Sequence, residues 1–343
     1  MKVKNTECLF FCKVHDFLHV YIPEHKNGTK NTFITYKQGL KTFRSYVNNI
    51  AGISTNQFEF KDCTYDFLLD YRNYLHNEEG LKEKTANNKL AVIKSYMKYA
   101  SARDVSLQQY AFAVSQVPLY SAPRIQQPVI EDVDALAALL GMPANTKKGL
   151  RDKVILSILY DGAIRVNELV SLKTGNISMA DDQSVRLRIH GKGNKERSIL
   201  LSIKTSALVR QYLDEYHPGS EKDVPFIYTV IGGIQKHMSI RNVQKLVKKY
   251  SDKVKAEYSL PESVSPHTLR RTRGTTLYRD GVDLPAISAL LGHEDIKTTK
   301  DYYASLSQEQ MREIANRKCE VVPDEEPFWS DDEDEMSRIL GLG

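Results

Sequence analysis

Apolar residues recur at three- and four-residue steps through most of the first 114 residues. The repeat is clearest in three stretches, 32–50, 64–78 and 84–104. In an α-helix such steps place side chains on one face, and that face packs into a core. The pattern therefore predicts a mostly helical domain over residues 8–114. Its expected core positions include Phe33, Tyr36, Leu40, Phe43, Val47, Phe67, Leu68, Tyr71, Leu75, Leu90, Ile93, Tyr96 and Met97.

In the third stretch, the face opposite the apolar stripe is expected to carry four lysines: Lys84, Lys89, Lys94 and Lys98. A row of lysines on a helix is commonly a solvated face. The same row would also suit a helix that lies along phosphates. The segment alone leaves both interpretations open, and we retain Lys84, Lys89 and Lys94 as candidate phosphate contacts.

Helical periodicity stops in residues 115–129, which hold three prolines. Proline lacks a backbone N–H donor and fixes φ, so a regular helix cannot run through this stretch. We therefore expect a linker here.

Beyond the linker, the pattern changes from a helical period to alternation and back. Residues 184–202 alternate apolar and polar on both sides of the sequence HGKGNK, which predicts a β-hairpin. Helical spacing marks five other stretches: 130–142, 148–163, 265–281, 283–293 and 297–317. The expected fold class is mostly α with a small antiparallel β-sheet, in a second domain of residues 130–318.

Charge divides the chain unevenly. Residues 319–343 hold nine acidic residues and one arginine, so they carry a charge of −8. Because the whole chain carries +5, residues 1–318 carry +13. A body this basic suggests a polyanionic partner, most commonly nucleic acid. The acidic segment has little periodicity, and we expect a disordered tail at least through Glu335.

The composition is typical of a globular chain, with 41% hydrophobic and 27% charged residues. No run of about 18 apolar residues is present and the start has no signal-peptide pattern, so we expect a cytoplasmic protein without a membrane span. The four cysteines, Cys8, Cys12, Cys63 and Cys319, include no second pair at metal spacing. Buried thiols are expected in preference to a metal site or a disulfide.

Four short motifs follow one another in the second domain. They are GAIRVNELVSL at 162–172, HGKGNKER at 190–197, HTLRRT at 267–272 and LGHEDIKTTKDYY at 291–303. Each alone is common, but their order and spacing resemble the tyrosine recombinase family, which includes phage integrases and Xer recombinases. The resemblance is close over about 130–310. It extends to 10–114 only in helical layout, at the position of the family's core-DNA-binding domain.

The resemblance implies that the chain cleaves and rejoins DNA through a 3′-phosphotyrosyl intermediate, without a cofactor or a metal. It identifies Arg165 and Arg270 with the family's two catalytic arginines. A phosphodiester under attack gains negative charge on its non-bridging oxygens, and guanidiniums bind such oxygens through bidentate hydrogen bonds. A salt bridge from Arg165 to Glu168 is an alternative, and the two roles are compatible because Glu168 could orient Arg165.

His267 lies three residues before Arg270, so both share one helix face. A phenol with a pKa of about 10 needs a proton acceptor in order to attack at neutral pH, and His267 suits that role. By resemblance, His293 donates a hydrogen bond to the scissile phosphate. Lys192, on the hairpin, is favoured as the proton donor to the departing 5′ oxygen, and Lys195 is its competitor or a phosphate contact.

Tyr302 and Tyr303 are adjacent candidates for the nucleophile. The family's spacing from the histidine of LGH selects Tyr302, nine residues after His293. On one straight helix that spacing would place the two on opposite faces, because each residue turns by about 100°. The segment EDIKTT is therefore expected to contain a break, and Tyr303 is then a packing residue.

The chain departs from the usual Xer pattern after HTLR, where it reads RTRGT in place of histidine, threonine and phenylalanine. Arg271 and Arg273 add positive charge at this point. They either contact DNA or pair with acids such as Asp280, and the sequence does not choose between these.

Together these features predict a site-specific recombinase that clamps double-stranded DNA between two domains. The resemblance implies a homo-tetramer on two duplexes, with accessory DNA-bending or directionality proteins as further partners. The chain begins close to the core-binding domain, its first half is not a close match to Xer sequences, and its acidic tail is foreign to their layout. An integrase of a mobile element is therefore favoured over an Xer-like housekeeping resolvase. A type IB topoisomerase and a catalytically silent DNA-binding protein are further alternatives.

Overall fold

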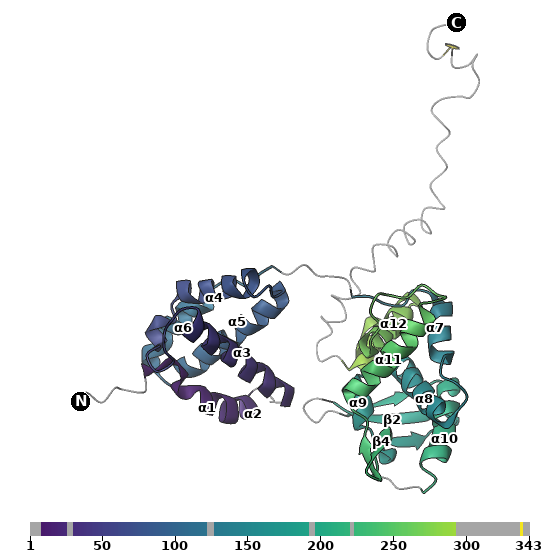
Figure 1. Ribbon diagram of the computed structural model, residues 1–343. Helices are drawn as coiled ribbons and strands as arrows, with labels where there is room; N and C mark the ends of the chain where they lie inside the picture. Colours follow the sequence, from purple (N-terminus) through teal and green to yellow (C-terminus); the bar gives the residue numbers. More distant parts are fainter. Residues whose placement is uncertain are drawn as a thin grey trace. The chain divides into compact units, whose positions relative to one another are not determined.

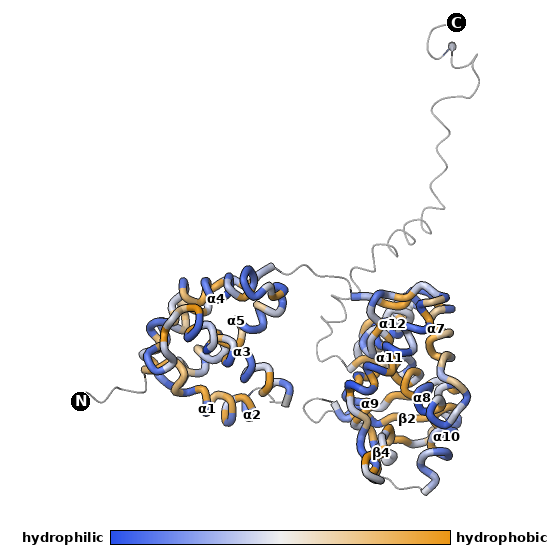
Figure 2. Tube along the Cα trace, in the orientation of Figure 1, coloured by the Kyte–Doolittle hydropathy of each residue, from blue (hydrophilic) through white to orange (hydrophobic). Residues whose placement is uncertain are grey.

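The computed structural model describes residues 8–25, 30–121, 127–191, 196–219, 223–292 and 337–338. The chain separates into two compact units, residues 1–126 and 127–343 (Figure 1). Both units are built mainly from helices. Figure 2 shows hydrophobic and hydrophilic segments alternating along these helices, as amphipathic helices that share a core require. No helix in the described ranges is long and apolar enough to cross a membrane.

The first unit is mostly helical, as the sequence predicts, with an isolated β-bridge between Leu9 and Glu59 in its described residues. Its elements are a 3-10 turn (Phe10–Lys13), α1 (Val14–Asp16), a π-helical stretch (Phe17–Tyr21), α2 (Ile22–His25), α3 (Lys30–Asn49), a 3-10 turn (Phe60–Asp62), α4 (Tyr65–Asn77), α5 (Glu83–Ser101), a 3-10 turn (Val105–Leu107) and α6 (Gln108–Ser115). Helix α4 begins where Thr64 accepts a hydrogen bond from the Phe67 N–H, which satisfies one of the free donors of the first turn.

An aromatic cluster around Phe10 forms the centre of the first unit's core. The Phe10 ring is fully buried, and its centroid lies 5.0–5.4 Å from five neighbouring rings, those of Phe11, Phe43, Phe58, Phe60 and Tyr96. Offset and edge-on ring pairs at this distance add to the free energy of burial. The cluster ties the first described residues of the chain to α3 and α5.

The apolar stripe predicted for α5 is confirmed, but the row of four lysines opposite it is not. Lys84 and Lys98 are exposed. Lys89 lies five residues after Lys84, a rotation of about 140°, so it borders the apolar face. Its Nζ donates to Thr42 Oγ1 at 2.8 Å, and burial lowers its pKa.

Lys94 is also turned toward the chain. Its Nζ donates to the carbonyl oxygens of Ser115 and Val117, and burial lowers its pKa. These contacts hold the end of α6 and the start of the expected linker against α5. Tyr120 is fixed too, because the Asn87 side chain bonds both its N–H and its carbonyl at 2.9 Å. The first part of residues 115–129 therefore packs on the first unit instead of spanning freely.

The expectation of buried thiols holds for one cysteine and is wrong for two. Cys63 is buried, and burial raises its pKa. Cys8 and Cys12 are exposed. The pattern misleads because Phe10, between them, takes the buried position. Cys319 and most of the acidic tail lie outside the described residues.

The second unit combines helices with two small antiparallel sheets. Its elements are α7 (Val133–Gly141), α8 (Lys147–Asp161), α9 (Val166–Ser171), a 3-10 turn (Thr174–Asn176), β1 (Ile177–Met179), β2 (Val185–His190), β3 (Glu196–Leu200), α10 (Ile203–Tyr216), β4 (Tyr228–Ile231), β5 (Ile234–His237), α11 (Ile240–Val254), α12 (Pro266–Arg279) and α13 (Leu284–Leu291). The predicted hairpin is confirmed as β2 and β3, which pair from Arg186 with Leu200 to His190 with Glu196. The predicted fold class is likewise confirmed.

The sequence patterns do not predict several elements of the second unit, among them α9 and β1. The hairpin of β4 and β5 turns at Gly232 and Gly233, whose φ values of 59° and 80° are those that a two-residue hairpin turn requires. Helices α10 and α11 were also missed. In α11 the buried residues recur at helical steps: Val243, Leu246, Val247, Tyr250 and Val254. The Gly-Gly pair and this repeat are signals that the sequence does contain.

Phe10→Ala is expected to destabilise the first unit by about 3–5 kcal/mol, since it removes the ring that the other five surround. Amide hydrogen exchange of α5, compared between variant and unchanged chain, measures this. Protection within about 1 kcal/mol of the unchanged chain would contradict the central role of Phe10.

Candidate active site

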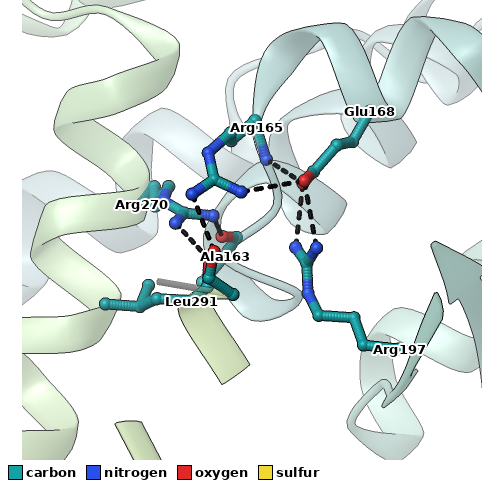
Figure 3. Close-up of polar contacts among 7 residues, drawn as sticks. Ala163, Arg165, Glu168, Arg197, Arg270 and Leu291 are labelled. Carbon is teal, nitrogen blue, oxygen red and sulfur yellow. Dashed lines mark hydrogen bonds and ion pairs between the residues drawn. The ribbon is translucent and has the colours of Figure 1, made fainter. Parts of the chain in front are cut away.

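Three arginines and one glutamate gather in the second unit (Figure 3). Arg165 directly precedes α9, Glu168 lies within α9, Arg197 is on β3 and Arg270 is on α12. The backbone carbonyls of residues 163, 291 and 292 complete the group. Segments far apart in the sequence are thus joined by polar contacts.

Arg270 is fixed by backbone carbonyls. Helix α12 begins at Pro266 with Ser265 as its N-cap, and its geometry directs Arg270 into the core, where the residue is only 5% exposed. Its Nη1 donates to Ala163 O at 2.6 Å, and its Nη2 donates to Leu291 O. A buried guanidinium needs such acceptors, because burial without them costs several kcal/mol.

Arg165 is fixed by Glu168 and by the turn after α13. Its Nη1 donates to Glu168 Oε1 at 3.0 Å, and its backbone N–H donates to Glu168 Oε2 at 2.7 Å. Its Nη2 donates to Gly292 O at 2.8 Å. The salt bridge that the sequence suggested is therefore present. The Arg165 side chain remains 34% exposed, so it is held in place and still accessible.

Glu168 binds two arginines at once. Arg197 donates from Nη1 to Oε1 at 3.0 Å and from Nη2 to Oε2 at 2.8 Å. Burial alone would raise the pKa of Glu168, but the hydrogen bonds from Arg197 and the Arg165 N–H, with both positive charges, lower it overall. Glu168 is therefore ionised at neutral pH. With Arg270, the group carries a net charge of +2, which suits an anion.

His267 lies one turn before Arg270 on α12. Its pKa is lowered from 6.5, first by partial burial and then by the positive charges of Arg270, Arg271 and Arg165. The imidazole is therefore neutral at pH 7, the form that accepts a proton. Because His267 and Arg270 share a helix face, the charge of Arg270 helps to lower the pKa of His267.

The other arginines of α12 make different contacts. Arg271 donates to Gln127 Oε1 and to Thr268 Oγ1, each at 3.4 Å. Arg273 forms an ion pair with Asp161 at 3.5 Å, so its acidic partner is not the suggested Asp280.

The remaining residues singled out by the motifs lie outside the described residues: Lys192, Lys195, His293, Tyr302 and Tyr303, with the expected helix 297–317. In the part of the chain that the structure covers, no group of three His, Cys, Asp or Glu side chains is placed to hold a metal ion.

Sequence reasoning missed a basic face on helix α11. Helix α11 contacts α9 and α12, which carry Glu168 and Arg270. Its buried stripe faces the core, and Arg241, Lys245 and Lys248 are exposed on the opposite side. They recur at steps of four and three, so they form one positively charged row.

Two models of protein families match this chain. Residues 132–309 match the phage integrase family, and residues 13–114 match the phage integrase SAM-like domain. The chain belongs to the phage integrase family. It is a tyrosine recombinase, an enzyme class that cuts and rejoins DNA, and the matched range includes the segment with both tyrosines.

Curated relatives extend over most of the chain. The tyrosine recombinase XerD of Staphylococcus epidermidis is 26% identical over 306 residues, 88% of this chain and 96% of the relative. The tyrosine recombinase XerC of Staphylococcus haemolyticus is 29% identical over 289 residues, 84% of this chain and 91% of the relative.

Solved recombinase structures share the fold. A crystal structure of the XerH recombinase bound to palindromic difH substrate, in a post-cleavage complex, matches with a TM-score of 0.65 and 20% identity over 84% of this chain and 80% of that one. The Tn1549 transposon integrase in complex with transposon right end DNA matches with a TM-score of 0.64 and 16% identity, over 90% of this chain and 99% of that one.

Arg271→Gln is expected to raise the pKa of His267, because it removes one of the positive charges that disfavour the imidazolium. Titration of the imidazole proton shifts by NMR measures the change. Arg210→Gln is the control, since Arg210 bonds Gln183 at the far end of β2. An unchanged or lower pKa in Arg271→Gln would contradict this electrostatic account.

Proposed function

We propose that this recombinase acts at specific sites and that Tyr302 is its nucleophile, in an integrase of a mobile element. The observation that carries the chemistry is the pair of guanidiniums, Arg165 and Arg270, each held by acceptors of the chain itself. Donors that are already fixed need no reorganisation when negative charge develops on a bound phosphate.

In the proposed reaction, the Tyr302 oxygen attacks a DNA phosphorus atom. Arg165 and Arg270 donate to the non-bridging oxygens, where the transition state concentrates its charge. His267 accepts the phenol proton, a role that its lowered pKa supports. His293 donates a further hydrogen bond to the phosphate.

Lys192 protonates the departing 5′ oxygen, and Lys195 contacts the backbone. The phosphodiester is exchanged for a phosphotyrosyl diester, and the DNA keeps a free 5′-hydroxyl. One ester replaces another, so the step needs no nucleotide hydrolysis. Attack by a 5′-hydroxyl on the phosphotyrosine reverses the step and rejoins the strand.

The proposed DNA contacts come from both units. On the second unit they include Arg271 and the exposed row of Arg241, Lys245 and Lys248 on α11. On the first unit, Lys84 is exposed and available, whereas Lys89 and Lys94 would have to leave their present acceptors. Lys84 is therefore the strongest of the three lysine proposals.

The assembly and cellular role complete the proposal. The chain works in the cytoplasm as a homo-tetramer on two duplexes, aided by DNA-bending or directionality proteins. The mobile-element role rests on the acidic segment from residue 319, which is foreign to the Xer layout. The second candidate is an Xer-like resolvase, favoured by the XerC and XerD relatives, of which the chain covers 91% and 96%.

Covalent trapping tests the nucleophile and the role together. The protein is mixed with sheared genomic DNA from its source organism, denatured, and the DNA-linked peptide and the attached ends are mapped. An adduct at one sequence that is lost in Tyr302→Phe and kept in Tyr303→Phe is expected. Ends that border a mobile element support an integrase, and a single chromosomal locus favours the resolvase.

Other outcomes of the trapping experiment contradict the proposal. Loss of the adduct only in Tyr303→Phe would move the nucleophile by one residue. Adducts without sequence preference would favour a type IB topoisomerase activity. A complete absence of adducts would favour a catalytically silent DNA-binding protein.

DNA affinity is expected to fall steeply with salt, because bound basic groups release counterions. Replacing Lys245 and Lys248 by alanine should reduce the slope of log K against log salt by about 2, one for each lost phosphate contact. Fluorescence anisotropy with a labelled duplex measures the slope. Lys204→Ala on α10 is the control, and an equal slope in all three proteins would exclude α11 from the DNA interface.

A further inference from the structure

Arg197 is the arginine of the charged group that the proposed reaction does not use. It lies on β3, and its side chain is 17% exposed, so it is less accessible than Arg165. Its two terminal nitrogens bind the two oxygens of Glu168 (Figure 3). Such a fork-to-fork pair fixes the plane of the carboxylate, which a single bond would leave free to rotate.

Each carboxylate oxygen of Glu168 accepts one hydrogen bond from Arg165 and one from Arg197. Oε1 accepts from Arg165 Nη1 and Arg197 Nη1, and Oε2 accepts from the Arg165 backbone N–H and Arg197 Nη2. The orientation of the Arg165 guanidinium therefore depends on a carboxylate plane that Arg197 sets. Without Arg197, the buried carboxylate would lose two donors and be free to turn toward other partners.

Gly292 is a second connection, after Glu168, between Arg197 and the Arg165 guanidinium. Its carbonyl accepts from Arg165 Nη2. A Cβ at this position would lie 2.8 Å from Arg197 Cζ, and the residue has a φ of +58°. The absence of a side chain lets the Arg197 guanidinium pack directly on the turn that holds Arg165.

We infer that Arg197 is a positioning residue for the strand-cleavage step: through Glu168 and the Gly292 turn, it holds Arg165 where the scissile phosphate binds. The inference rests on the proposed function, in which Arg165 neutralises charge on that phosphate. Arg197 itself does not touch DNA. Lysine cannot replace it, because an ammonium group offers no planar fork.

The test compares cleavage rates on two substrates that contain the site mapped by covalent trapping. One carries the ordinary scissile phosphodiester. The other carries a methylphosphonate, whose methyl group replaces a non-bridging oxygen and removes the negative charge. Arg197→Ala is expected to cleave the phosphodiester up to about 100-fold more slowly than the unchanged chain, as a misplaced catalytic group does. On the methylphosphonate, the two proteins should cleave at similar rates.

Four further variants sharpen the comparison, one of them Glu168→Gln alone. Arg197→Lys keeps the charge and should still be slow on the phosphodiester, which carries the test if Arg197→Ala fails to fold. Arg197→Ala combined with Glu168→Gln should be no slower than the slower single variant, because both act through one carboxylate. Arg210→Ala removes an arginine of α10 that bonds Gln183, just before β2, and it should match the unchanged chain on both substrates.

Each alternative result is distinct. If the unchanged chain forms no covalent product, the proposed function fails. If the unchanged chain cleaves and Arg197→Ala matches it, the inference fails. If Arg197→Ala also cleaves the methylphosphonate more slowly than the unchanged chain, the inference is overturned. It is likewise overturned if the two rates become equal only on a 5′-bridging phosphorothiolate, whose leaving group needs no proton. Either result assigns Arg197 to another step.

Discussion

One buried carboxylate, that of Glu168, holds the guanidiniums of Arg165 and Arg197 together in the second unit. It accepts hydrogen bonds from Arg165 and Arg197, and those contacts outweigh the effect of burial, so that its pKa is lowered. Breaking a buried charge network by removing one partner is commonly far more costly than the network's net contribution to stability. The arrangement is therefore better understood as a means of placing guanidiniums than as a means of stabilising the fold.

Backbone carbonyls near the site hold Arg165 and Arg270 in a similar way. Arg270 is anchored by carbonyls of residues 163 and 291, and Arg165 by that of residue 292. The end of α13 therefore serves both arginines, and it leads directly to the segment with His293 and Tyr302. Partial burial, and then the positive charges of Arg270, Arg271 and Arg165, lower the pKa of His267. The arginines proposed to bind the phosphate thus also favour the neutral imidazole proposed to accept the proton.

Local sequence signals predicted much of this arrangement. Helical spacing located α3, α4, α5 and α12, and alternation located the hairpin of β2 and β3, because these patterns report which face is buried. The motifs brought Arg165, His267 and Arg270 forward, and the structure places them near one another. The prediction that all four lysines of α5 lie opposite the apolar stripe is wrong for Lys89 and Lys94, because counting lysines ignores rotation about the helix. The contact of Arg197 with Glu168 joins residues 29 positions apart and has no local signal.

The most direct test of the central claim is a crystal structure of the chain bound to its nicked target duplex with vanadate. Vanadate takes a trigonal bipyramidal form that resembles the transition state of phosphoryl transfer, so it reports the groups that bind that state. The account predicts that the Arg165 and Arg270 guanidiniums contact the equatorial oxygens and that the Tyr302 oxygen is apical. Equatorial oxygens bound by other side chains, with Arg165 still turned wholly toward Glu168, would contradict it.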